Sequence, residues 1–312
     1  MTRYRECFPV VDATEAVSMG SPQTLVDPLD SPLEVVEYSC DSPLRHPGKL
    51  VAAMFGDFIR SRELIWTLFT RDMRAQFRQS VLGYLWLLLP PVATAAVWLF
   101  LQSQKILNVQ TEIPYPVFIL VGTTVWISFV NLINAPLQGF NNGKAIYTKL
   151  NVPPEAFVMS AVLRAILNFL IRIGILIPVF VYFKFTPPWT AFLFPVAVMS
   201  FFLIALAIGL WAIPFGSLFS DVGNFLTNFV RIFMYLSPVI YPIGRKTGWF
   251  KAIMVYNPLT PGVAWSRDTI TTGSYEWAVP CLVYGGISVI LIFLALIFLR
   301  ISRPHLVARL GM

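Results

Sequence analysis

Long apolar runs, separated by short polar segments, occupy most of the chain after residue 80. Six of these runs approach the roughly 20 residues that a helix needs to cross a bilayer. The pattern therefore predicts an all-α polytopic membrane protein with six transmembrane helices. The predicted spans are Val81–Leu101, Pro116–Ile133, Ala156–Phe183, Ala191–Pro214, Phe225–Pro242 and Trp277–Leu299.

A helical pattern of a different kind covers residues 51–80. Its apolar side chains recur every four residues, and its arginines lie largely off that stripe. A cationic helix with one apolar face is typical of the membrane interface, so we predict an N-terminal amphipathic interfacial helix. The alternative is a helix that packs on the protein's own core. The stripe consists of Ile65, Phe69, Met73 and Phe77.

Residues 71–91 join this basic segment to the first apolar run without a linker. The basic half cannot cross a bilayer, whereas the apolar half is uncharged and long enough to do so. The junction therefore places a membrane surface near Ser80.

The two ends of the chain are polar. Residues 1–44 hold eight acidic residues, two arginines and no lysine. Such a segment buries too little apolar surface to offset its ordering entropy, so we predict that residues 1–50 form a disordered cytoplasmic tail. A docking peptide for a partner subunit is the alternative. Residues 81–299 form the predicted six-helix transmembrane domain, and residues 300–312 form a cytoplasmic C-terminal tail.

The segment before the last span, Gly244–Glu276, mixes aromatic residues with glycine and proline. Its apolar pieces, Trp249–Tyr256 and Leu259–Ile270, are too short to cross a bilayer and are joined by an Asn257-Pro258 turn. We predict that these pieces are re-entrant or interfacial helices.

Composition agrees with a membrane protein. The 312 residues are 56% hydrophobic and only 12% charged, with a mean hydropathy of +0.69, whereas soluble domains carry about 25% charge. A net charge of +7 would suggest nucleic acid for a soluble protein. Here the cations lie beside apolar runs, so anionic lipids and topology explain them better, and no nucleic acid partner is expected.

The distribution of lysine and arginine predicts the topology. With both termini in the cytoplasm, the inner segments hold fourteen of these cations and the outer segments hold six. Loops rich in lysine and arginine stay on the cytoplasmic side. An even number of spans also places both termini on one side.

Catalytic chemistry is not apparent in the sequence. Gly139–Ala145, GFNNGKA, resembles a Walker A loop, but it is one residue short and lacks the Ser or Thr that would hold magnesium. The cysteines Cys7, Cys40 and Cys281 lack the spacing of a metal site. HExxH and GxSxG motifs do not occur. The chain is therefore expected to be non-enzymatic, with no cofactor or metal of its own.

Three arginines lie inside predicted spans, where a charge is costly unless it faces a cavity or a partner. Arg164 lies near the inner end of its helix and can snorkel to the surface. Arg172 and Arg231 lie deeper. They either line a water-filled path for an anionic substrate or form hydrogen bonds with neighbouring helices, for example at Asn168 or Asn228.

Aromatic residues also suggest a path for a substrate through the membrane. Phe225, Phe229 and Phe233 recur every four residues, with Tyr235 nearby, whereas Tyr84 and Trp86 mark the inner end of the first span. Such rings could stack on sugars along a channel. Packing against lipid and helices, or anchoring at the membrane interface, is the alternative.

Three motifs in order resemble the permease subunits of ABC exporters for polysaccharides and polyol phosphates. Arg71–Trp86 reads RDMRAQFRQSVLGYLW, followed by Pro90; Ser237–Pro242 reads SPVIYP; and Asn257–Leu259 reads NPL. The resemblance covers about residues 58–299. Departures occur at Gln76 and Phe77, where the family usually has Arg and Tyr, and at Ser220, where Arg is usual.

The resemblance implies a homodimer in the bacterial cytoplasmic (inner) membrane. Two copies of a separate ABC ATPase would dock beneath it and carry the ATP and Mg. The substrate would be a lipid-linked glycan of the O-antigen, capsular or teichoic acid type, moved outward across the membrane. The alternatives are an ABC permease for small hydrophobic compounds and an ATP-independent carrier or scramblase.

The resemblance also implies roles for particular residues. The inner loop Gln138–Glu155 is similar to the family's coupling helix, expected to form a short helix along the membrane, and the turn at Phe219–Val222 is similar to a second ATPase contact. The expected coupling residues are Asn142, Lys144, Tyr147, Lys149 and Asp221, and the expected substrate-entrance residues are Arg71, Asp72, Arg74 and Arg78. Together with the residues proposed above, the predicted channel lining is Tyr84, Trp86, Arg172, Phe229, Arg231, Phe233 and Tyr235.

Overall fold

The computed structural model describes residues 56, 59–78, 80–106, 111, 113–147, 152–243 and 249–310. All of them lie in one compact unit, residues 43–312. The prediction of a disordered tail at residues 1–50 and the coupling residue Lys149 lie outside the described residues. The regular elements are α2 (Arg62–Phe77), α3 (Leu85–Ser103), α4 (Tyr115–Tyr147), α5 (Pro154–Ile173), α6 (Leu176–Tyr182), η2 (Trp189–Leu193), α7 (Phe194–Gly216), α8 (Ser220–Phe233), η3 (Met234–Leu236), α9 (Trp249–Tyr256), α10 (Thr260–Ile270) and α11 (Ala278–Leu310).

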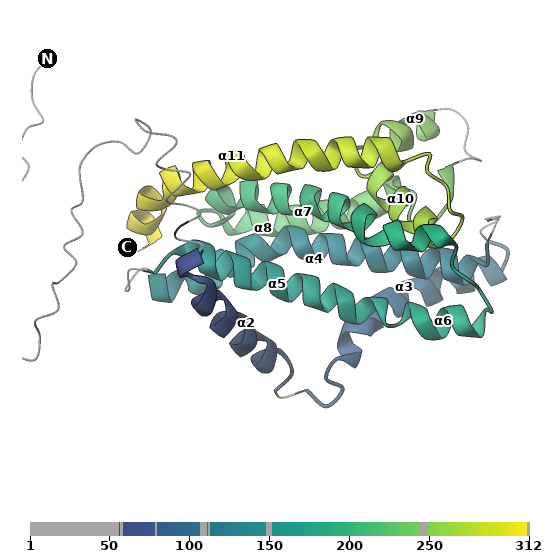
Figure 1. Ribbon diagram of the computed structural model, residues 1–312, viewed down its shortest axis with the longest axis horizontal. Coiled ribbons are helices and arrows are strands. Elements are labelled where there is room, and N and C mark those ends of the chain that lie inside the picture. Colours follow the sequence, from purple (N-terminus) through teal and green to yellow (C-terminus); the bar gives the residue numbers. More distant parts are fainter. Residues whose placement is uncertain are drawn as a thin grey trace, which may run out of the picture. The chain divides into compact units, whose positions relative to one another are not determined.

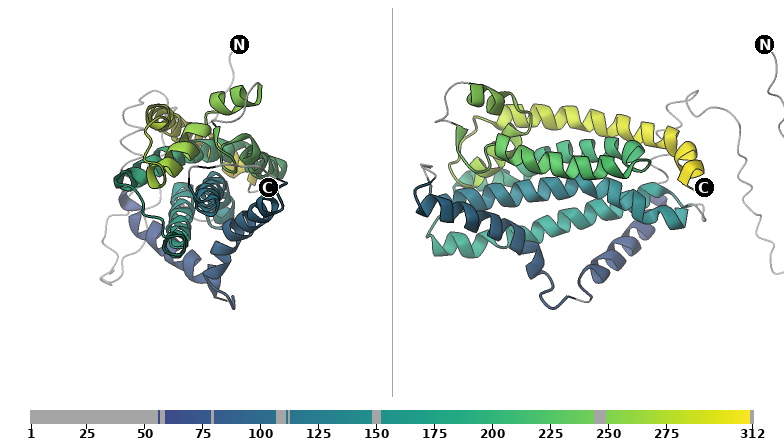
Figure 2. Two further views of the ribbon diagram at one scale, coloured as in Figure 1. Left: turned by 90° about the vertical axis from the view of Figure 1, so that its right-hand side faces the viewer. Right: turned by 180° about the vertical axis from the view of Figure 1, so that it is seen from behind.

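The all-helical fold is confirmed, and α4 forms its centre. Helix α4 packs between α5 and α7, and α7 in turn packs against α11; α3 and α8 contact other faces of α4 (Figures 1 and 2). The membrane-length stretch of α4 is 83% buried, whereas that of α3 is 17% buried. An apolar helix that is covered on most sides by other helices occupies the core of a bundle.

Five helical segments are long and apolar enough to cross a membrane within the described residues. They are Leu85–Ser103, Tyr115–Tyr147, Pro154–Tyr182, Trp189–Gly216 and Ala278–Ser302. The predicted fifth span, Phe225–Pro242, is instead the 14-residue α8 followed by the short η3. The total of six spans therefore stays a prediction.

Glycines bring α4 unusually close to its neighbours. A Cβ atom at Gly209 of α7 would lie 2.4 Å from the backbone oxygen of Ile133, and one at Gly139 of α4 would lie 2.6 Å from that of Phe157. Gly143, one turn after Gly139, faces the ring of Phe157. Two glycines four residues apart form the small-residue face that lets membrane helices approach closely.

This packing corrects the prediction for the inner loop. Gln138–Tyr147 does not form a separate helix along the membrane but continues α4 without a break. The glycines of GFNNGKA, which could suggest flexibility, are held in the helix by their contact with α5. The resemblance of this segment to a phosphate-binding loop is therefore coincidental.

The helix α2 confirms the predicted amphipathic pattern. Ile65 and Leu68 are buried in a cluster with Phe157 of α5 and Leu299 of α11, whereas the ring of Trp66 is exposed. The first turns of α2, with Ile65 of the stripe, thus pack on the protein's own core, as the alternative prediction proposed for the helix. Figure 1 shows α2 slanting away from α5 toward its connection to α3. Whether the exposed face lies in the membrane interface stays a prediction.

That cluster defines one end of the bundle, called the α2 end from here on. It joins residues of α2, the last turns of α4, the first turn of α5, and parts of α7 and α11. The opposite end, called the α10 end, holds the two short helices that were predicted before the last span. Helix α9 has the predicted bounds, α10 begins one residue later than predicted, and α10 is buried along nearly its whole length.

Two sequence motifs meet at the α10 end. The side chain of Asn257 donates a 3.0 Å hydrogen bond to Ser237 Oγ and accepts one of 3.0 Å from the Leu259 amide. The guanidinium of Arg267 donates a 2.6 Å hydrogen bond to the Pro238 carbonyl and lies 4.0 Å from the centre of the Phe118 ring. The turn at Asn257 and the last turn of α10 therefore hold the irregular segment after η3 in place.

Replacement of Asn257 by alanine is expected to lower the free energy of unfolding by about 1–2 kcal/mol. The change removes both hydrogen bonds and leaves buried partners unsatisfied. Thermal unfolding of the purified chain in detergent measures the effect. Asn224→Ala, at an exposed position of α8, is the matched control, and an equal loss in both variants would contradict this role.

Candidate functional site

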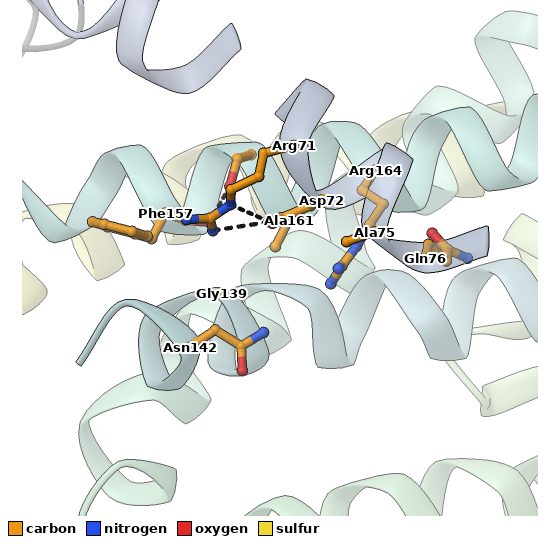
Figure 3. Close-up of a pocket in the computed structure, with 10 residues that line it drawn as sticks. Arg71, Asp72, Ala75, Gln76, Gly139, Asn142, Phe157, Ala161 and Arg164 are labelled. Atoms are coloured by element: carbon orange, nitrogen blue, oxygen red, sulfur yellow. Dashed lines mark hydrogen bonds and ion pairs between the residues drawn. The ribbon is translucent and has the colours of Figure 1, made fainter. Parts of the chain in front are cut away.

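A cavity of about 470 Å³ opens between α2, α4 and α5 at the α2 end (Figure 3). Its polar walls come from three helices, since each contributes side chains to the same space. They are Arg71, Asp72 and Gln76 of α2, Asn142 of α4, and Ser160 and Arg164 of α5. The cavity therefore joins the predicted substrate entrance on α2 to the predicted coupling segment of α4.

The cavity carries a net positive charge. Arg71 forms a 2.9 Å ion pair with its neighbour Asp72, and the Arg71 side chain remains 56% exposed. Arg164 adds a second guanidinium from another helix (Figure 3). Two guanidinium groups thus face one carboxylate. Because guanidinium groups bind phosphate and carboxylate oxygens with two parallel hydrogen bonds, the cavity is chemically suited to an anionic group.

Arg164 is the residue of this cavity that sequence reasoning set aside. Its position near the helix end suggested snorkelling, and nothing nearby in the sequence marked a partner. The sequence feature that could have identified Arg164 is its spacing. Phe157, Ala161 and Arg164 recur at helical intervals and face the cavity together. The partner helix α2 lies too far away in the sequence for that face to be recognised.

Arg74 and Arg78, the other predicted entrance residues, face a different space. They line a hollow of about 370 Å³ together with Thr67, Thr70 and Arg71. Both arginines are exposed. Arg71 borders both spaces, so the four predicted entrance residues divide between two sides of α2.

A tight turn connects this helix to α3. The hydroxyl of Ser80 accepts a 3.0 Å hydrogen bond from the Gly83 amide, and Gly83 has a φ of +51°, which favours glycine. The rings of Phe77 and Tyr84 pack 4.3 Å apart across the turn. Tyr84 and Trp86, both predicted to line a channel, are exposed on the subunit.

The predicted coupling residues differ in exposure. Asn142 is exposed and Lys144 is half-buried on the last turns of α4, and Asp221 is exposed in the first turn of α8. The ring of Tyr147, in contrast, is buried against those of Phe140 and Phe157, at centre distances of 5.2 and 6.3 Å. Tyr147 therefore anchors the end of α4 and cannot contact a partner without unpacking.

The two predicted coupling segments lie close together. Leu137 of α4 packs against Gly216 at the end of α7 and against Gly223 in the first turns of α8. Further along α8, the Thr227 hydroxyl donates a 2.8 Å hydrogen bond to Asn134 Oδ1 of α4. The turn that carries Asp221 is thus attached directly to the helix that carries Asn142 and Lys144.

Arg172 does not line an open path in the structure. Its side chain is buried; Nε donates a 3.1 Å hydrogen bond to the Leu87 carbonyl, and Nη1 donates one of 3.3 Å to Ser128 Oγ. In a regular helix the amide of residue 91 would bond to Leu87, but residue 91 is proline. Arg172 therefore supplies the missing donor, and the predicted channel role is corrected to helix stabilisation.

Arg231 occupies a different environment. Arg231 is exposed on α8; Phe229 and Tyr235 are also exposed, and Phe233 is half-buried. The rings of Phe225 and Phe229 stack 5.2 Å apart, and those of Phe229 and Phe233 lie 4.7 Å apart. The predicted aromatic stripe therefore forms a continuous row of ring contacts, whereas Arg231, two residues after Phe229, lies on a different side of the helix.

Comparison with known proteins places these features in a family. The O-antigen export system permease protein RfbA of Myxococcus xanthus is 23% identical over 237 residues, which cover 75% of this chain and 90% of that protein. RfbA of Klebsiella pneumoniae is 25% identical over 226 residues, covering 71% and 85%. The polysialic acid transport protein KpsM of Escherichia coli is 23% identical over 237 residues, covering 75% and 91%. Residues 63–271 match the ABC-2 type transporter family, and because this match covers more than half of the chain, the chain belongs to that family.

Proposed function

We propose that the chain is the permease subunit of an ATP-driven exporter that moves a lipid-linked polysaccharide out of the cytoplasm. Membership of the ABC-2 family supports a transport role with an ABC ATPase as partner. The names of the relatives support a polysaccharide substrate, because they export O-antigen and transport polysialic acid.

The α2 end is proposed to face the cytoplasm. Arg62, Arg71, Lys144 and Arg164 lie toward this end on α2, α4 and α5. Cytoplasmic segments carry the excess of lysine and arginine in membrane proteins. In this orientation both chain termini are cytoplasmic, and the buried helix α10 lies toward the outer surface.

The ATPase is proposed to dock on the α2 end. Asn142, Lys144 and Asp221 lie on segments that Leu137 holds together. A push on either segment would therefore move α4 and α8 as one body. Two ATPase copies, holding ATP and Mg²⁺, would act on a homodimer of this chain in the bacterial inner membrane.

The observation that carries the proposal is the cationic cavity between α2, α4 and α5. A phosphate group of a lipid carrier at the cytoplasmic membrane surface could be bound there by Arg71 and Arg164. The amide of Asn142, in the same cavity, belongs to the helix proposed to contact the ATPase. The proposed substrate site and the proposed ATPase contact would thus both include helix α4.

The Arg71→Glu, Arg164→Glu double variant is expected to lower substrate-stimulated ATPase activity by about tenfold or more, because each lost charge-assisted hydrogen bond is worth about 1.5–3 kcal/mol. The chain is reconstituted with its ATPase in liposomes, and lipid-linked glycans are added. Basal hydrolysis is expected to stay unchanged.

Arg62→Glu is the matched control, since Arg62 is exposed on the same helix but does not line the cavity. Stimulation that survives the double variant would contradict the proposed phosphate site. Stimulation by small apolar compounds alone, with no response to any lipid-linked glycan, would contradict the proposed function as a whole.

A further inference from the structure

The cations of α2 are not confined to the cavity. A separate hollow of about 370 Å³ is lined by Thr67, Thr70, Arg71, Arg74, Ala75 and Arg78. Arg74 and Arg78 are four residues apart, so they lie one turn apart on the same face of the helix. Ile65, which is buried against the bundle, lies nine residues before Arg74 and therefore on the opposite side of the helix. The hollow thus faces away from the bundle.

Guanidinium groups are the hydrogen-bond donors that this hollow offers. The hydroxyls of Thr67 and Thr70 already donate to carbonyls of their own helix, at 2.8 and 2.9 Å. Arg74 and Arg78, in contrast, make no hydrogen bond or ion pair through their side chains with any residue that the structure describes. Two charged donors are therefore available to a ligand.

No carboxylate of α2 neutralises this face. Asp72 pairs with Arg71 at 2.9 Å and lines the cavity on the other side. Glu63 is exposed, but it lies eleven residues before Arg74, about 16 Å along the helix. The hollow is therefore cationic. Its chemistry suits an anion whose oxygens accept hydrogen bonds from guanidinium groups, such as a phosphate.

Apolar side chains follow the hollow directly. The turn after α2 exposes Val81 completely and about half of Leu82, and Leu85 at the start of α3 is 58% exposed. Helix α3 is long and apolar enough to cross a membrane. Figures 1 and 2 show the end of α2 and this turn projecting from the side of the bundle. The cationic hollow thus lies beside the start of a membrane span, at the level of the phospholipid headgroups.

The two surfaces together match one kind of molecule better than an anion alone. A phospholipid places its phosphate at the membrane surface and its acyl chains just inside, in the same order as the arginines and the apolar turn. A free phosphate or an acidic peptide would leave the apolar turn uncovered. A headgroup with a net negative charge fits best, because guanidinium groups repel the quaternary ammonium of phosphatidylcholine.

We propose that Arg74 and Arg78 form a binding site for an anionic phospholipid of the membrane, separate from the cavity that is proposed for the lipid carrier. The headgroup phosphate accepts hydrogen bonds from both guanidinium groups, and the acyl chains lie along the apolar turn. Because Arg71 borders both the hollow and the cavity, the bound lipid holds the end of α2 beside the cavity. The two arginines, predicted at the substrate entrance, are thus assigned to the surrounding membrane.

The test measures which phospholipid lies beside the turn. A fluorophore is attached to Val81→Cys in the full chain with Cys7→Ser and Cys40→Ser, since Cys281 is buried. The labelled chain is reconstituted in phosphatidylcholine vesicles that contain a small fraction of either phosphatidylglycerol or phosphatidylcholine with a quenching group on its acyl chain. Quenching gives the relative association of the two lipids at this position. The chain is expected to prefer phosphatidylglycerol about tenfold.

The Arg74→Gln, Arg78→Gln double variant is expected to lose that preference, so that both lipids quench equally. Arg74→Lys with Arg78→Lys keeps both charges and is expected to retain most of it. The matched control is Arg60→Gln with Arg62→Gln. These arginines are also exposed but do not line the hollow, so removal of the same two charges there is expected to leave the preference within about twofold of the starting value.

Several results would overturn the inference. Equal quenching by the two lipids in the chain with all its arginines would do so, and so would a preference that survives the Arg74, Arg78 replacement. Loss of the preference on addition of excess inorganic phosphate would assign the hollow to free phosphate. A preference that appears only after the eight acidic residues of positions 1–44 are replaced by amides would assign it to the chain's own segment. The test requires neither the ATPase nor a glycan, so its outcome is independent of the proposed function.

Discussion

Gly209→Ala is expected to lower the free energy of unfolding by about 3 kcal/mol. The new Cβ atom would lie 2.4 Å from the Ile133 carbonyl oxygen and 2.9 Å from the ring of Pro136. Backbone and proline ring cannot rotate away as a flexible side chain can. The helices α4 and α7 must therefore separate, and overpacking of this kind costs about 1–3 kcal/mol or more.

Gly286→Ala is the matched control for this prediction. Gly286 lies in α11, and a Cβ atom there would meet nothing within 4 Å. Alanine is favoured over glycine in a helix by about 1 kcal/mol, so this variant is expected to be neutral or slightly stabilised. Thermal unfolding in detergent compares the two variants. Equal changes in the free energy of unfolding of the two variants would show that the close approach of α4 and α7 contributes little to stability.

Arg172→Met is expected to lower the free energy of unfolding by about 2 kcal/mol in the wild-type background. The change leaves the Leu87 carbonyl, which Pro91 cannot satisfy, without its donor inside the protein. In a Pro91→Ala background the helix supplies its own amide to Leu87. The same arginine replacement is then expected to be less destabilising by about 1–2 kcal/mol, so the two changes are coupled.

Arg164→Met gives the control for this cycle. Arg164 lies on the same helix two turns earlier but lines the cavity beside α2, so its effect is expected to be independent of Pro91. The four stabilities of the Arg172 cycle are measured by unfolding under one set of detergent conditions. A coupling energy near zero would contradict the assignment of Arg172 as the substitute donor.

The short helices at the α10 end show what local sequence features can predict. The bounds of α9 agree with the prediction and α10 starts one residue later, because a turn at Asn257-Pro258 and the loss of apolar residues mark their ends locally. The end of α4 shows the limit. Polar residues and two glycines predicted a loop, but contact of Gly139 and Gly143 with α5 keeps the helix intact to Tyr147.

The candidate site likewise contains residues that local sequence features identified and residues that they did not. The arginines of α2 were recognisable because their spacing and the adjoining apolar run are local features. Arg164, the other guanidinium of the cavity, was not recognisable, since its role depends on the approach of α2 to α5. Arg172 and Arg231 looked alike in the sequence, as isolated arginines within apolar runs, yet one is buried and bonded and the other is exposed.

By itself the sequence determined the class of the protein, the position of most helices and the presence of a basic segment before the first span. Helix length, hydropathy and turn residues are properties of consecutive positions, so they can be read along the chain. Only the tertiary structure decided which cations are neutralised and which remain available. Burial and hydrogen bonding depend on partners from distant segments, such as Leu87 for Arg172, 85 residues away, and for Arg231 on the lack of one within the described residues.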